Sequence, residues 1–124
     1  VDTALKIKRK KRVKLKLGNV DIYRDWGWAP DYIKAIWLML QRTKPKDFII
    51  GSGKTHSLNE FVNEVFRYLN ISKKNLKTNV SKYKRKIDLK GYKANIKETQ
   101  KILKWKPSLK FKTIIHKMIN NELF

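Results

Sequence analysis

A capping box followed by an amphipathic run constrains the fold of this chain more than any other feature of its sequence. Ser57 and Glu60 stand three residues apart, so the hydroxyl and the carboxylate can each satisfy a free backbone amide at a helix start. Behind them apolar residues recur at helical spacing as far as Leu69. The pattern predicts a helix with one buried face, and other elements must cover that face.

Helix-like and strand-like segments alternate along the rest of the chain. Residues 3–12 read as the end of a helix, and residues 13–17 alternate apolar and polar side chains as a half-buried strand does. Pro30 suits a first helical turn, and the spacing behind it predicts a helix to Arg42 with Trp37 in the core. The other predicted elements are a buried strand at 47–51, a possible strand at 78–80, a helix capped at Asn95 that runs to Leu103, and a last helix over 111–119. This order predicts an α/β fold.

Composition narrows the class of protein. A chain of 124 residues with 41% hydrophobic residues is one domain, or a piece of one, with a modest core. It starts at Val1 inside a helix-like run, so we expect a fragment of a longer protein. The absence of cysteine excludes a disulfide framework and a thiolate zinc site, and permits a cytoplasmic location. No apolar run approaches the ~20 residues of a membrane span, so we expect a soluble chain.

The formal net charge of +21 raises the question of polyanion binding. Lysines that neutralise phosphates release counterions, and residues 6–16 with Arg9 and Arg12 would form the patch. Lysine also recurs on every predicted helix and in every loop, which favours a lysine-rich solvent-facing surface over one binding stripe. Because no RNA- or DNA-binding motif is visible, we expect no specific nucleic-acid binding, but nonspecific adhesion to polyanions at low salt. A basic module acting on nucleic acid or other polyanions remains the alternative function.

Residues 51–55 end like a phosphate-binding loop and follow a strand-like run. The full pattern requires a glycine where Phe48 stands, and the next helix begins too late for its amides to cradle a phosphate beside Lys54. A turn that uses glycine flexibility explains the segment better. His56 is expected to be solvated and His116 to be partly buried, and neither has carboxylate or thiol neighbours at metal-ligand spacing.

Two arginines on separate segments suit a ligand with two phosphates. Arg24 lies in a polar and aromatic segment between a strand-like run and a helix, and Arg85 follows a long loop. Each planar guanidinium group can meet phosphate oxygens with two hydrogen bonds. Spacing alone does not show that the two converge. Trp26, close to Arg24, suits a pocket wall and a loop anchor equally well.

Several blocks of the sequence resemble the GDP-mannose 4,6-dehydratase family, which belongs to the extended short-chain dehydrogenase/reductase group. The blocks stand in the family's order: LGNVD at 17–21, RDWG at 24–27, PDYIKAIWLMLQ at 30–41, DFIIGSG at 47–53, HSLNEFV at 56–62 and ILKWKP at 102–107. The resemblance covers nearly the whole chain. It implies that residues 1–124 are the C-terminal substrate-binding segment of a Rossmann-type enzyme.

The resemblance also implies site residues. In the family the arginine of the RDWG block contacts the diphosphate of the GDP-sugar, a role that carries over to Arg24. The asparagine of the first block contacts the nucleotide, which carries over to Asn19, with Leu17 and Gly18 forming the adjoining wall.

A later Arg-Pro-Ala-Glu block of the family corresponds to residues 85–88 of this chain. Arg85 would supply the second phosphate contact, and Asp88 would meet substrate hydroxyls. The proline is lost here and the carboxylate is one methylene shorter. These residues therefore do not decide whether the substrate is GDP-mannose, a GDP-heptose or another nucleotide sugar.

For the full enzyme the resemblance implies a lyase with bound NADP. Hydride leaves C4 of the sugar, water is lost across C5–C6, and hydride returns to C6, which gives a 4-keto-6-deoxy sugar nucleotide. The Gly-rich cofactor turn, the catalytic Thr and Glu and the Tyr-x-x-x-Lys pair would lie upstream of Val1. We therefore expect no catalytic, cofactor-binding or metal-binding residue in this chain, and no activity from it alone. An inactive remnant is a further alternative.

The same resemblance predicts partners for the chain. The helix at 30–41 and the strand at 47–51 would pack against the upstream Rossmann portion, and the full-length enzyme would be a homo-oligomer. Without a cover, this surface would expose apolar side chains, so we expect the chain to associate when it is expressed alone.

Overall fold

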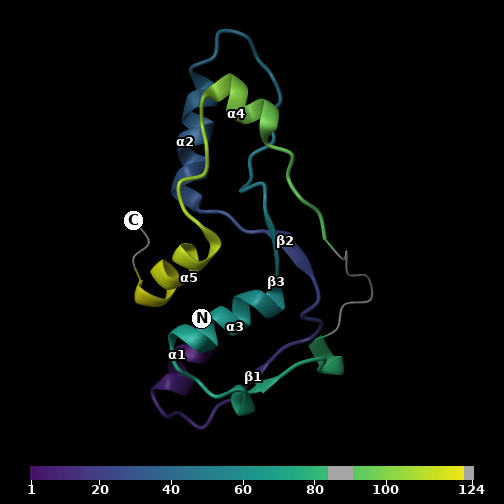
Figure 1. The fold of residues 1–124 in the computed structure, drawn as a ribbon, viewed down its shortest axis with the longest axis vertical. Helices are drawn as coiled ribbons and strands as arrows, with labels where there is room; N and C mark the ends of the chain where they lie inside the picture. The colour runs from purple at the N-terminus through teal and green to yellow at the C-terminus, as the bar shows by residue number, and fades with distance from the viewer. Residues whose placement is uncertain (84–90, 122–124) are drawn as a thin grey trace.

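The computed structural model describes residues 1–83 and 91–121, and Figure 1 shows their arrangement. The helices are α1 (Asp2–Lys8), α2 (Ala29–Leu40), α3 (Leu58–Tyr68), α4 (Lys97–Leu103) and α5 (Phe111–Asn120), with short 3-10 turns η1 (Lys73–Asn75) and η2 (Ser81–Tyr83). The strands are β1 (Leu15–Lys16), β2 (Tyr23–Asp25), β3 (Thr55–Ser57) and β4 (Leu76–Lys77). The predicted α/β class is confirmed, with helices dominant.

The strands form two separate pairs. β1 pairs with β4 in parallel, and β2 pairs with β3 in antiparallel orientation. The strand predicted at 78–80 is wrong, because the left-handed backbone of Asn79 (φ 56°) ends the extended run after β4. The strand predicted at 47–51 does not form either, since the carbonyl of Ile49 accepts from the Thr99 hydroxyl at 2.8 Å instead of from a neighbouring strand.

The first core lies around α3, and its capping box is present as predicted. The amide of Glu60 donates to the Ser57 hydroxyl at 3.0 Å, and the amide of Ser57 donates to the Glu60 carboxylate at 3.3 Å. The buried members of this core come from α1, α3 with its end, and α5: Ala4, Val62, Val65, Phe66, Leu69, Ile115 and Ile119. The helix with one covered face is thus confirmed.

A second core joins α2 to α4 and to the segment behind α4. Ala35, Leu103 and Trp105 are its buried members. The Trp105 indole donates to the carbonyl of Asp31 at 3.0 Å, and the Asp31 carboxylate accepts from the amide of Ser108 at 2.8 Å. α4 begins after Ile96, one residue later than the cap predicted at Asn95, but the Asn95 side chain still accepts from the amide of Lys97 at 3.4 Å.

The outward face of α2 is apolar and exposed. The prediction that Trp37 lies in the core is wrong, because its residue surface is 58% exposed. Ala35 and its neighbours take the inward face against α4, and this leaves Ile33, Ile36, Trp37 and Leu40 toward solvent in the described chain. The apolar surface expected on this helix is therefore present.

Candidate functional site

The β2–β3 pair positions Arg24. Its register places Arg24 opposite His56, with Tyr23 opposite Ser57. The Arg24 side chain turns along the strand, where one guanidinium nitrogen donates to the carbonyl of Tyr23 at 2.7 Å. The guanidinium carbon lies 5.7 Å from the centre of the Tyr92 ring, within the range of a cation–π contact. Arg24 is thus held between β2 and the segment that begins at Gly91.

Gly91 permits a close approach of that segment to β2. A Cβ atom at this position would lie 2.6 Å from the Cβ of Tyr23 and 3.2 Å from its carbonyl oxygen. A pocket of about 330 Å³ opens beside the contact and is lined by Tyr23, Thr55, Gly91, Tyr92 and Lys93. Its aromatic rings, hydroxyl groups and lysine, with the nearby guanidinium, suit an anionic ligand that also carries polar groups.

The sequence alone does not single out the residues that form this wall. Thr55, Tyr92 and Lys93 come from two segments whose proximity depends on the β2–β3 pair and on Gly91. A glycine directly before an aromatic and a basic residue was the one local signal available. It was too general to predict a pocket.

The other predicted site residues lie on the segment between β1 and β2. The carbonyl of Gly18 accepts from the amide of Asn79 at 2.9 Å, and the side chain of Leu17 packs against the first core. The Asn19 side chain accepts from the amide of Asp21 at 2.9 Å and shapes a turn. Leu17, Gly18 and Asn19 do not line the pocket beside Tyr92. Arg85 and Asp88 lie outside the described residues.

Asp25 fixes the glycine-containing turn that resembles a phosphate-binding loop. Its carboxylate accepts from the amide of Ser52 at 2.6 Å and from the amide of Gly53 at 2.9 Å. Gly53 has a φ of 71°, which an L side chain rarely adopts. The prediction of a turn is confirmed, and the amides that could cradle a phosphate already have an anionic partner.

His56 and Trp26 stabilise the contact of β3 with the first core. The His56 ring stacks on Phe111 at 3.9 Å between centroids, and its Nδ1 lies 2.8 Å from the Glu60 carboxylate. The expectation of a solvated His56 is therefore wrong. The Trp26 indole donates to the carbonyl of His56 at 3.3 Å, and its ring packs on Phe61 at 5.1 Å. These contacts favour the loop-anchor interpretation of Trp26.

A buried carboxylate links α3 to α5. Glu64 contacts Arg67 through two hydrogen bonds, and its Oε1 lies 2.7 Å from Nε2 of His116. The hydrogen bonds from Arg67 lower the pKa of Glu64 to about 2, helped by His116 and opposed by burial. Because His116 also stacks on the Tyr68 ring at 4.1 Å, its predicted partial burial is confirmed. The group joins two helices and faces no described pocket.

Tyr32 is not an activated phenol, and the described residues contain no metal-binding cluster. Burial raises the pKa of Tyr32, and Asp25 and Asp31 raise it further, so this phenol is held protonated. No cluster of three or more His, Cys, Asp or Glu that could hold a metal ion occurs within residues 1–83 and 91–121. In the same residues no helix has the length and apolar character of a membrane span.

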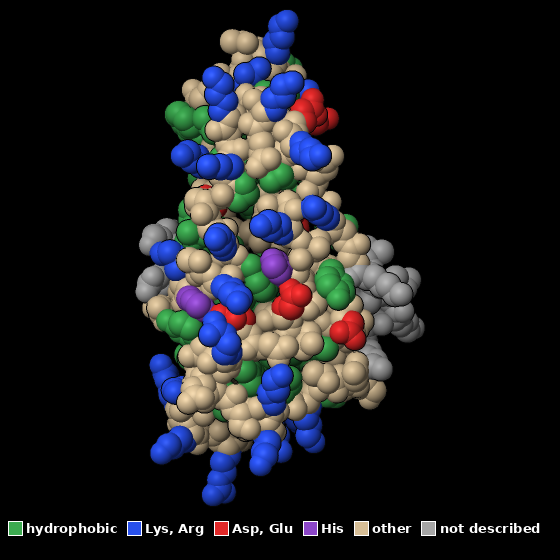
Figure 2. Space-filling model, viewed as in Figure 1, with side chains coloured by type: hydrophobic (Ala, Val, Ile, Leu, Met, Phe, Trp, Pro, Cys, Tyr) green, Lys and Arg blue, Asp and Glu red, His purple; other side chains and the backbone are tan. Residues whose placement is uncertain are grey.

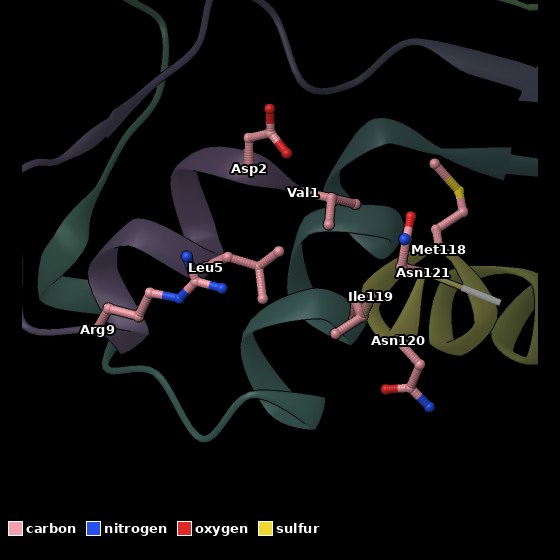
Figure 3. A pocket seen from close by; sticks show the side chains of 8 residues that line it. All are labelled: Val1, Asp2, Leu5, Arg9, Met118, Ile119, Asn120 and Asn121. Carbon is pink, nitrogen blue, oxygen red and sulfur yellow. The ribbon is translucent and has the colours of Figure 1, made fainter. Parts of the chain in front are cut away.

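A larger hollow lies away from Arg24, between α1 and the end of α5. It measures about 580 Å³, and Figure 3 shows Leu5 of α1 and Arg9, directly after α1, across from Ile119 and Asn120. None of the predicted site residues lines it. It is therefore separate from the arginine site.

The fold matches solved structures over nearly its whole length. RMD from Pseudomonas aeruginosa, solved with NADPH, matches with a TM-score of 0.82 at 14% identity, covering 97% of this chain and 39% of that one. dTDP-glucose 4,6-dehydratase from Bacillus anthracis, solved with NAD, matches with a TM-score of 0.78 at 19% identity, covering 95% of this chain and 36% of that one. The fold is that of Rossmann-type extended short-chain dehydrogenase/reductase enzymes.

Sequence comparison narrows this class to a family. A family model described as GDP-mannose 4,6 dehydratase matches residues 1–118. GDP-mannose 4,6 dehydratase 1 of Arabidopsis thaliana is 33% identical over 112 residues, which cover 90% of this chain and 31% of that protein. The human GDP-mannose 4,6 dehydratase is 32% identical over 124 aligned residues, covering 86% of this chain and 33% of that protein. The chain belongs to the GDP-mannose 4,6-dehydratase family and spans about a third of the length of these relatives.

Proposed function

We propose that this chain is the nucleotide-sugar-binding part of a GDP-mannose 4,6-dehydratase, in which Arg24 binds the diphosphate of the substrate. The observation that carries the proposal is the placement of Arg24, within the family's RDWG block, beside a pocket with polar and basic walls. A guanidinium group held by its own strand is already oriented, so little side-chain entropy is lost when phosphate oxygens bind.

The remaining contacts follow the family pattern. Asn19 meets the nucleotide with Leu17 and Gly18 beside it, Arg85 supplies a second phosphate contact, and Asp88 meets a sugar hydroxyl. The backbone bonds of Gly18 and the turn made by Asn19 support a preformed wall. GDP-mannose is the proposed substrate, and the whole enzyme, a homo-oligomer, converts it to GDP-4-keto-6-deoxymannose.

NADP is the proposed cofactor of the whole enzyme, where it accepts and returns the hydride. The turn at Ser52 and Gly53 does not fit a cofactor phosphate, because both amides already donate to the Asp25 carboxylate. The cofactor site and the catalytic residues are proposed to lie in the Rossmann portion of the full enzyme. The 124-residue chain is therefore expected to bind substrate and to leave it unconverted.

Calorimetric titration of the chain with GDP-mannose and with GDP tests the proposal. Arg24→Ala should weaken binding of both by about 1.5–3 kcal/mol, the range for a hydrogen bond to a charged group. Arg42→Ala, an exposed change just beyond the C-terminal end of α2, is the matched control and should leave the affinity unchanged. Equal affinities for the two variants would remove Arg24 from the site, and no heat with either ligand would favour an inactive remnant.

A double-mutant cycle tests whether Arg24 and Arg85 meet the same diphosphate. Two arginines on one pyrophosphate should give a coupling energy of about 0.5–3 kcal/mol in the affinity for GDP. Strictly additive losses would place Arg85 at another site.

A further inference from the structure

Parts of two long sequence stretches that lack acidic residues lie side by side in the structure. No Asp or Glu occurs between Asp2 and Asp21, or between Glu64 and Asp88. β1 comes from the first stretch and β4 from the second, and the two strands pair. In Figure 2, Lys and Arg side chains are spread over the whole visible face, but at its lower end, where β1 and β4 lie in Figure 1, no Asp or Glu side chain of the described residues stands among them. The fold thus concentrates positive charge that the sequence distributes over two segments.

The β1–β4 pair points leucines inward and lysines outward. Leu15 and Leu76 are register partners, and both pack against the first core. Lys16 and Lys77 are the next partners along the strands, so their side chains share the opposite, exposed face. Because paired strands lie about 4.8 Å apart, these two like charges start from adjacent positions and repel each other. A bound polyanion would relieve this repulsion.

Further exposed lysines stand next to this pair in the chain, since Lys14 directly precedes β1 and Lys73 and Lys74 belong to η1, which directly precedes β4. We call the set the basic ridge: Lys14, Lys16, Lys73, Lys74 and Lys77. An exposed aromatic ring stands at one end of it. The amide of Val80 donates to the carbonyl of Leu17 at 3.0 Å, and the amide of Tyr83 donates to the carbonyl of Val80 at 2.9 Å, so η2 is tied to the end of β1. The surface of Tyr83 is 50% exposed.

We propose that the basic ridge and Tyr83 bind single-stranded nucleic acid without sequence preference. Lysines that follow a phosphate backbone, next to an aromatic ring on which a base stacks, are the recurring parts of such surfaces. An anionic membrane is less favoured, because the ridge lacks the broad apolar face that an interfacial helix buries in lipid. The inference does not depend on the nucleotide-sugar proposal, since the two use different residues.

Fluorescence anisotropy with a labelled oligothymidine of about 20 nucleotides, measured at several salt concentrations, tests the proposal on the 124-residue chain. Two charge-reversal variants change the net charge equally. The ridge variant combines Lys14→Glu, Lys16→Glu and Lys77→Glu. The control variant combines Lys44→Glu, Lys101→Glu and Lys106→Glu, which are exposed positions at the α2–α4 end. The ridge variant should lose at least about tenfold more affinity than the control, and its salt slope should fall by about 2, since each phosphate contact contributes about 0.7.

Two single variants separate binding from folding. Tyr83→Ala should lower the affinity about fivefold or more with an unchanged salt slope, because stacking releases no counterions. Lys16→Glu should weaken binding and raise the thermal midpoint, because it replaces repulsion with attraction to Lys77. Because affinity should fall while the thermal midpoint rises, Lys16→Glu tests the proposal even if the triple ridge variant does not fold. Equal losses of oligothymidine affinity in the two triple variants would mean that only the net charge matters, and would overturn the proposal. Tight binding to phosphatidylserine vesicles that oligothymidine does not displace would also overturn it.

Discussion

Of the two acidic residues between β1 and α2, Asp21 and Asp25, we expect Asp25 to contribute more to the free energy of unfolding. Asp25→Ala removes the partner of two backbone amides, those of Ser52 at 2.6 Å and Gly53 at 2.9 Å. A hydrogen bond to a charged group is worth about 1.5–3 kcal/mol, and both amides are only partly buried, so water recovers part of the loss. We expect a net loss of about 2–4 kcal/mol in the free energy of unfolding.

Thermal and urea denaturation followed by circular dichroism measure this loss. For a chain of this size it corresponds to a fall of roughly 8–16 °C in the thermal midpoint. Asp25→Asn should be intermediate, because an amide presents one acceptor oxygen where the carboxylate presents two. The control is Asp21→Ala, an exposed change on the same segment that should stay within about 0.5 kcal/mol. If Asp25→Ala is as mild as this control, the two amides do not depend on the carboxylate, and the assignment of the turn is refuted.

Other predictions address the helices. The pKa of Glu64 is lowered from its ordinary 4.5 to about 2, so its contacts with Arg67 and His116 stabilise the fold fully above pH 4.5 and are lost as the pH falls toward 2. Glu64→Gln should therefore make the urea midpoint less dependent on pH between 4.5 and 2. The same pH dependence in the variant and in the unchanged chain would contradict this. Ser57→Ala removes one half of the capping box and should cost about 1 kcal/mol in urea denaturation, whereas no change would mean that water replaces the cap. Trp37→Ser should lower self-association in sedimentation at an unchanged thermal midpoint, and equal association would place the contact on another surface.

The features predicted well from the sequence are those that neighbouring residues determine. The capping box at Ser57, the helix behind it and the turn at Gly53 each depend on side chains within a few positions of one another. Helical spacing misplaces Trp37, because α2 is apolar on two faces and the spacing does not say which face meets α4. β2 and β3 were missed for a related reason. Each is three residues long and contains polar residues, and it becomes a strand only because the other lies beside it.

The candidate site is the least predictable part, because it joins segments far apart in the chain. The sequence singled out Arg24 through its resemblance to the RDWG block, while Thr55, Tyr92 and Lys93 reach the same place only through the β2–β3 pair and Gly91. Convergence of that kind depends on tertiary packing, which no local pattern encodes.

The adjacent residues Arg24 and Asp25 divide two tasks through strand geometry. Successive side chains of a strand point to opposite faces, so one member of the pair can meet Tyr92 while the other meets the turn at Ser52 and Gly53. The Asp25 carboxylate holds β2 against the turn at Ser52 and Gly53, and it thereby fixes the backbone from which the Arg24 guanidinium extends. Exchanging the two residues would keep composition and charge but would direct an arginine at amide donors, which it cannot bind because it has no acceptor. The order of the dipeptide, rather than its content, therefore makes the segment a phosphate-binding candidate.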